Sequence, residues 1–203
     1  MVDKDLGGWL LVTVSTAGAP AALRVTVWRK LKELGALYLQ QSVTLLPRRP
    51  ATENAVTQLV TRIRRDGGTA RVLTIDLADK AQEQDVIAEL QAARTGEYGE
   101  ILGRFPSFFA ELEMESARGR TTFEEVEESE VDLARFRTWL RKTAARDYFQ
   151  APLGQKARDE LRRAEQVMAR FAELAMQADN NTLNENADGA DAAQAARLRP
   201  LNR

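Results

Sequence analysis

Basic side chains are the groups in this sequence best suited to binding chemistry. They form three clusters: Arg24, Arg29, Lys30 and Lys32; Arg48 and Arg49; and Arg62, Arg64 and Arg65. Guanidinium and ammonium groups bind oxyanions, so the clusters predict a surface that contacts nucleic-acid phosphates. The residues expected to make these contacts are Arg24, Arg29, Lys30, Arg48, Arg49, Arg62 and Arg65. The alternative is a solvated helix face with favourable charge at helix C-termini.

Two missing residue types exclude much other chemistry. The 203 residues include no Cys and no His, which excludes disulfides, thiolate zinc sites and the usual catalytic triad. The serines have no imidazole to activate them, and no glycine-rich nucleotide-binding motif is present. We therefore predict a protein that is not an enzyme and that has no cofactor and no metal site.

Two further charged segments are interpreted as structural. The acidic run from Glu124 to Glu130 spreads around a helix, which indicates a solvated face near a helix N-terminus and not a metal site. Arg146 and Asp147 stand beside Tyr148 and Phe149. Aromatic neighbours indicate a packed turn, so this pair is predicted to be an internal ion pair.

Charge is segregated along the chain, although the net charge is only −1. Residues 1–76 carry 11 basic and 6 acidic side chains, residues 77–133 carry 5 and 15, and residues 134–178 carry 10 and 5. The basic parts can attract a polyanion, and the acidic middle can attract them within the fold or meet a partner.

The elements that position the basic clusters follow from hydrophobic spacing. Short apolar runs predict strands at residues 8–15, 36–39, 43–46 and 69–76. Between them, one helix follows Pro20 and ends at Gly35, and a second is capped by Thr52 and ends at residues 66–68. This order is the ferredoxin-like βαββαβ unit, placed at residues 8–78. Both faces of the first strand are apolar, so the rest of the chain or an identical sheet in a homodimer must cover the second face.

Helices are predicted for most of the remaining chain. Capping boxes at Asp79 and Thr122 begin two of them, and Pro106 kinks or restarts the first. The last helix carries an apolar seam, formed by Ala157, Leu161, Ala164, Met168, Phe171, Ala175 and Ala178. The seam predicts a helical hairpin with the preceding helix, or else pairing with another molecule. The predicted fold class is thus α+β: the ferredoxin-like domain, a helical extension packed on it at residues 79–178, and a disordered tail at residues 179–203.

The sequence predicts a cytoplasmic protein. No stretch reaches the roughly 18 uncharged apolar residues of a membrane span, and the start of the chain is acidic where a signal peptide is basic. We therefore expect no membrane partner.

Spaced motifs carry a family resemblance. They are Trp28-Arg29-Lys30-Leu31, Leu34-Gly35-Ala36, Leu39 to Gln41, Leu46-Pro47, Phe123 to Glu128, Asp132-Leu133, Trp139 and Arg146-Asp147-Tyr148-Phe149. In order and spacing they resemble the N-terminal region of the chromate resistance protein ChrB, over residues 9 to about 175. The resemblance implies a bacterial regulator of chromate-efflux genes that binds promoter DNA.

A more distant likeness is to the ferredoxin-like domain of PaaX-type repressors and, through it, to small CRISPR-associated nucleases of that fold. Those nucleases hold a metal with an Asp at the end of the first strand. This chain has Val14-Ser15-Thr16 there, which disfavours a metal nuclease.

The expected function is therefore a DNA-binding, homodimeric regulatory module of chromate resistance. The longer ChrB proteins continue into a second domain associated with the chromate response, so a separate sensor protein would supply that part. The first alternative is a dimerisation or protein-docking module that does not bind DNA. The second is an enzyme that uses carboxylates or a bound anion.

Overall fold

The chain folds into two compact units. The computed structural model describes residues 7–119 and 121–197, and of residues 181–197 the backbone alone. The first unit contains the described residues up to Tyr98 together with Arg141–Gly154, and the second contains Gly99–Leu140 and the described residues from Gln155 onward. The sequence placed a boundary at residue 79, whereas this division falls inside a helix, because the first part of that helix packs on the sheet.

The first unit is built on a four-stranded sheet. Its elements are β1 (Trp9–Ser15), α1 (Ala21–Glu33), β2 (Leu37–Gln40), β3 (Val43–Pro47), α2 (Pro50–Arg65) and β4 (Thr69–Ile75). The strand order is β2-β3-β1-β4, and all three neighbouring pairs are antiparallel. The predicted α+β class is confirmed.

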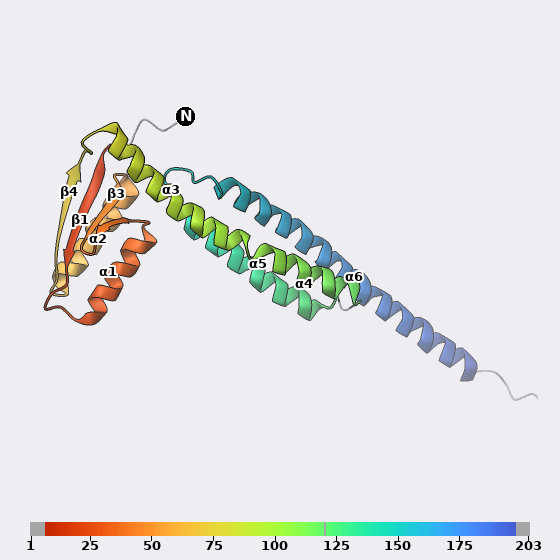
Figure 1. Cartoon of the computed structure of the whole chain (residues 1–203). Coiled ribbons are helices and arrows are strands. Elements are labelled where there is room, and N and C mark those ends of the chain that lie inside the picture. The colour runs from red at the N-terminus through yellow and green to blue at the C-terminus, as the bar shows by residue number, and fades with distance from the viewer. Residues whose placement is uncertain (1–6, 120, 198–203) are drawn as a thin grey trace, which may run out of the picture. The chain divides into compact units, whose positions relative to one another are not determined.

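Helices α1 and α2 cover one face of this sheet (Figure 1). Leu10 and Val12 of β1 point to that face and are buried with Val27 of α1 and Ile63 of α2. The surfaces that the two helices bury are thus apolar stripes at helical spacing, and their basic residues lie outside these stripes.

The chain itself covers part of the second face. Trp9 and Leu45 are buried there with Leu90 of α3 (Lys80–Leu102). The Phe149 ring stacks on the Trp9 ring, with 5.8 Å between centroids. Leu73, whose partner across the sheet is Leu11, stays half exposed. The sequence left two alternatives for the second face, the rest of the chain or a homodimer. Around Trp9, the rest of the chain covers it.

The second unit is helical. Its elements are α4 (Phe105–Ala117), most of α5 (Phe123–Ala144) and most of α6 (Gly154–Arg197). The Phe136 ring lies 4.5 Å from the Phe105 ring and 5.6 Å from the Phe108 ring, and Arg137 of α5 pairs with Glu165 of α6 at 2.7 Å. Most of the seam predicted for the last helix is buried, namely Ala157, Ala164, Met168, Phe171 and Ala175.

Two local features differ from the sequence prediction. Thr52 is not the N-cap of α2: the helix begins at Pro50, and the Thr52 hydroxyl accepts a hydrogen bond from the Arg49 amide and lies 2.7 Å from the Pro47 carbonyl. Pro50 starts the helix because proline has a helical φ and needs no partner for an amide. The α6 backbone continues to Arg197, through most of the segment predicted to be disordered, where alanine favours helix. Residues 198–203 of that prediction lie outside the described residues.

Candidate nucleic-acid interface

Three of the seven predicted basic residues meet in one groove. Arg29 and Lys30 of α1 and Arg62 of α2 line a cavity of about 400 Å³ between the two helices. The residues are brought together because α1 and α2 bury their apolar stripes side by side on the same sheet face. Gln58 also lines this α1–α2 groove, as does Glu33, the one acidic residue among the described residues that line it.

The electrostatics of the α1–α2 groove favour an anion. Lys30 pairs with Glu33 at 3.3 Å, and Arg62 pairs with Asp66 at 3.5 Å. Both pairs are largely exposed, so solvent and salt weaken them and a phosphate can compete for the cations. No ion pair of Arg29 is found among the described residues, which leaves its guanidinium available to a ligand.

The other four predicted residues lie elsewhere. Arg24 lines a separate cavity on the other flank of α1. Arg48 is exposed and pairs with Glu53 at 2.6 Å. Arg65 bonds to Asp66 at 3.0 Å, and the hydrogen bonds from Arg65 and Arg62 hold the pKa of Asp66 below its ordinary value, against a smaller opposite effect of burial.

Arg49 is held inside the first unit. Its Nη2 donates a hydrogen bond of 2.8 Å to the Tyr148 carbonyl, and its guanidinium lies over the Tyr148 ring at 5.3 Å. Arg48 and Arg49 directly follow Pro47, which predicts that both are exposed in a loop. Arg48 is exposed, whereas Arg49 is half-buried. The Arg49 guanidinium donates its hydrogen bond to Tyr148, which lies 99 residues further along the chain.

Two of the spaced motifs meet in a structural cluster that sequence reasoning missed. We call it the Gly35 junction and define it by Leu34, Gly35, Arg94, Glu97, Tyr98, Arg146, Asp147 and Tyr148. All of these residues belong to the first unit. The Tyr148 hydroxyl donates to the Leu34 carbonyl at 2.8 Å. A Cβ on Gly35, whose φ is +69°, would lie 2.6 Å from Arg94 Nη1 and 2.9 Å from Arg146 Cβ.

The charges of the Gly35 junction are satisfied mainly within it. Glu97 pairs with Arg94 at 2.8 Å and with Arg146 at 2.7 Å. Burial lowers the pKa of Arg94 below its ordinary value, and the charge of Glu97 opposes that shift. Arg94 Nε and Nη1 are buried and have no hydrogen-bond partner among the described residues.

The interpretation of Arg146 and Asp147 as parts of a packed turn is confirmed, but their partners differ from the predicted ones. Arg146 pairs with Glu97, and Asp147 accepts hydrogen bonds from the Tyr98 hydroxyl and the Ala151 amide. Neighbouring residues in a turn point in different directions, so each finds a more distant partner. The tyrosines beside charged groups were the one signal in the sequence that could have indicated this cluster.

The acidic run of α5 forms a field of like charge in the second unit. Partial burial raises the pKa of Glu125, and the nearby carboxylates of Glu115, Glu128, Glu124 and Glu111 raise it further. In the part of the chain that the structure describes, no three Asp or Glu side chains are grouped so that they could hold a metal ion. Over the same residues, no helix is both long and apolar enough to cross a membrane.

Comparison with known proteins gives the family. A family model described as "Protein ChrB, N-terminal" matches residues 24–182. The curated protein named Protein ChrB from Cupriavidus metallidurans is 30% identical over 123 residues, which cover 61% of this chain and 34% of that protein. No solved structure matches significantly. The family match spans the basic helices, the Gly35 junction and the acidic run, and the chain therefore belongs to the ChrB N-terminal family.

Proposed function

We propose that this chain is a regulatory module of chromate resistance that binds duplex DNA through the α1–α2 groove and catalyses no reaction. The observation that carries the proposal is the meeting of Arg29, Lys30 and Arg62 in one open groove, where Glu33 is the single acidic lining residue in the described part of the chain. Membership in the ChrB family supports the regulatory part, because the resemblance implies control of chromate-efflux genes. The matched region is about a third of the curated relative, and the proposal includes a sensor protein as a partner of this module.

The sheet order supports the finer fold assignment. Four antiparallel strands in the order β2-β3-β1-β4, with α1 and α2 on one face, are the arrangement expected of a ferredoxin-like domain. In this proposal, the outer surfaces of α1 and α2 contact the phosphates. We assign no base readout, and a homodimer would present two such grooves to one duplex.

The test is a titration of fluorescent duplex DNA from the region upstream of the gene, repeated over a salt series. Each phosphate neutralised should contribute a slope of about −0.9 to log K against log[salt]. The double variant Arg29→Gln/Arg62→Gln should make the slope shallower by roughly two units and should weaken binding to specific and random duplexes alike.

Two control variants make the test specific to the groove. Arg48→Gln removes an exposed arginine that is paired with Glu53 and lies outside the groove, so it should change the slope by less than half as much as the double variant. Charge reversal at Glu124 and Glu125 should not weaken DNA binding. If the wild type binds no duplex in a salt-dependent way, the DNA-binding proposal fails.

A protein-docking module is the second candidate. Phe123 and Val131 are both about half exposed, and they flank the acidic run of α5. An exposed apolar residue at each end of an acidic helix face is a surface that a basic, partly apolar protein partner could bind. This reading takes the place of the first if DNA binding is absent.

A further inference from the structure

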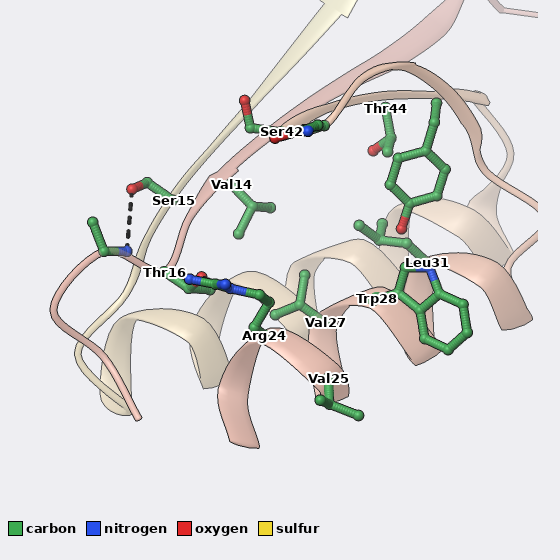
Figure 2. A pocket seen from close by; sticks show the side chains of 13 residues that line it. Val14, Ser15, Thr16, Arg24, Val25, Val27, Trp28, Leu31, Ser42 and Thr44 are labelled. Carbon is green, nitrogen blue, oxygen red and sulfur yellow. Dashed lines mark hydrogen bonds between the residues drawn. The ribbon is translucent and has the colours of Figure 1, made fainter. Parts of the chain in front are cut away.

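A second hollow of the first unit lies on the other flank of α1 from the α1–α2 groove. It has a volume of about 680 Å³ and lies between α1, the end of β1 and the β2–β3 hairpin (Figure 2). Cavities of about 300–1,000 Å³ are typical of small-molecule sites. We call it the Trp28 cavity.

The Trp28 cavity is lined by apolar, aromatic and basic side chains. Val27 and Leu31, both buried in the core, form an apolar base, and the Trp28 and Tyr38 side chains line the cavity while 51% and 39% exposed. Among the described residues that line it, Arg24 is the one with a charge, and none carries a carboxylate. Aromatic side chains left this exposed beside a hollow indicate a surface that a planar group can cover.

The spacing on α1 places a cation one helical turn from an aromatic ring. Arg24 and Trp28 are four residues apart, so they lie on the same face of the helix. In Figure 2 the Arg24 side chain extends toward Thr16, and the Trp28 indole lies further along α1 beyond Val27. The Arg24 Nε to Thr16 Oγ1 distance of 3.5 Å is at the limit of a hydrogen bond. A negatively charged ligand group would accept a stronger hydrogen bond from Arg24 than the Thr16 hydroxyl does.

Lys32 favours an anion as well. Its Nζ lies 5.1 Å from the centroid of the Trp28 ring, so a second positive charge is held beside the indole. The hydroxyls of Ser15 and Ser42 also line the cavity and can bond to polar atoms of a ligand.

From this arrangement we infer that the Trp28 cavity binds a small planar aromatic anion, whose ring packs on Trp28 and Tyr38 and whose acidic group bonds to Arg24. Aromatic carboxylates and nucleoside monophosphates share this chemistry. The inference does not depend on DNA binding, because Arg29, Lys30 and Arg62 line a different groove.

The test is a titration of the ¹⁵N-labelled full chain, followed through the tryptophan indole N–H signals. The chain has three tryptophans. Trp9 is buried and bonded to Glu83, so its signal reports on the core and not on the cavity.

The probes are 2-naphthoate with its neutral analogue 2-naphthamide, and AMP with adenosine. The Trp28 signal, assigned with Trp28→Phe, should shift and saturate with at least one anion, and that anion should bind about tenfold or more tightly than its neutral analogue. Which anion binds more tightly distinguishes a carboxylate from a phosphate ligand.

Matched variants on one helix identify the cation. Arg24→Gln should remove most of the preference for the anion, because Lys32 stays in place, and should leave the affinity of the neutral analogue unchanged. Arg29→Gln, which changes an arginine of α1 that faces the other groove, should leave both affinities unchanged. Both arginines are exposed, so these variants should keep the dispersed amide spectrum of the wild type.

Three results would overturn the inference. The first is a Trp28 signal that no probe shifts at millimolar concentration. The second is equal binding of anion and neutral analogue in the wild type. The third is a Trp28 signal that moves only with duplex DNA or with protein concentration, because the cavity would then belong to a nucleic-acid or self-association surface.

Discussion

Gly35 packs so closely against Arg94 and Arg146 that there is no room for a side chain. Gly35→Ala should lower the free energy of unfolding by about 2–4 kcal/mol, because the new methyl group meets Arg94 Nη1 and Arg146 Cβ in a left-handed backbone conformation. Urea unfolding followed by far-UV circular dichroism measures the loss.

The matched control is Gly18→Ala. Gly18 has a φ of +78°, but a Cβ there would meet nothing within 4 Å. It should therefore lose only the backbone strain, about 1 kcal/mol. Equal losses in the two variants would mean that packing at the Gly35 junction contributes nothing.

Glu125 gives a pH-dependent prediction. Its pKa is raised in the folded chain above the ordinary value of 4.5, first by partial burial and then by its acidic neighbours. Folding is therefore favoured while the carboxyl is protonated, and this contribution is lost as the pH rises through the folded pKa.

Accordingly, Glu125→Gln should be more stable than the wild type at about pH 7, and the difference should vanish below about pH 4. Thermal melts over a pH series measure this difference. Glu127→Gln, on an exposed position of the same helix, is the control that should show a smaller change. A variant that is less stable than the wild type at neutral pH would contradict the assignment.

The residue types of the basic surface could be predicted from the sequence, but their partners could not. Clustering of basic residues along the chain indicated Arg29, Lys30 and Arg62, and the structure places them in one groove. Arg49 and Arg146 are bonded to residues 99 and 49 positions away. Local spacing carries no information on such distant contacts, so adjacent residues such as Arg48 and Arg49 looked equivalent.

Among the described elements, α3 covers part of the second sheet face. Leu90→Ala should lower the free energy of unfolding by about 2–4 kcal/mol, because Leu90 is buried against Trp9 and Leu45 on the second sheet face. Tryptophan fluorescence during urea unfolding measures the loss.

Leu73→Ala is the control on the same sheet face. Leu73 is 50% exposed, and its truncation should cost less than about 1 kcal/mol. Should Leu90→Ala prove neutral, α3 would not be the cover that stabilises this face, and a second copy of the chain would take that role.

Element order was predictable because hydrophobic period distinguishes strand from helix. The four predicted strands and the capping role of Asp79, which accepts a hydrogen bond from the Gln82 amide at 2.9 Å, match the structure. The choice between α3 and a homodimer was not predictable, because an apolar strand face indicates that a cover exists and does not identify it.

For the whole molecule, removal of residues 179–203 should leave the melting temperature nearly unchanged. Residues 176–180 of α6 are exposed, and the residues that follow them in the sequence are mostly Asn, Asp and Ala, which have little apolar surface to bury. Far-UV circular dichroism should lose helical signal while the melting midpoint stays within about 2 °C. A larger fall would show that the segment docks on the protein.

A dimer in solution remains a prediction that the sequence motivates. Light scattering at micromolar concentration should give twice the 22.7 kDa chain mass. A monomer mass would mean that each molecule presents one α1–α2 groove, and not two, to the proposed DNA partner.

The hydrogen bond from Tyr148 to Leu34 joins residues 114 positions apart. The ribosome must synthesise all of residues 99–140 between the two sequence segments that form the first unit. At about 5–20 residues per second, a ribosome that has finished β4 at Ile75 needs about 4–15 s more to reach Tyr148 and Phe149. During this interval the nascent sheet has all four strands but lacks the Phe149 ring that stacks on Trp9. Residues 99–140 thus lengthen the time during synthesis in which the Trp9 ring still lacks its Phe149 neighbour, and that side of the ring is open to chaperones and to other emerging chains.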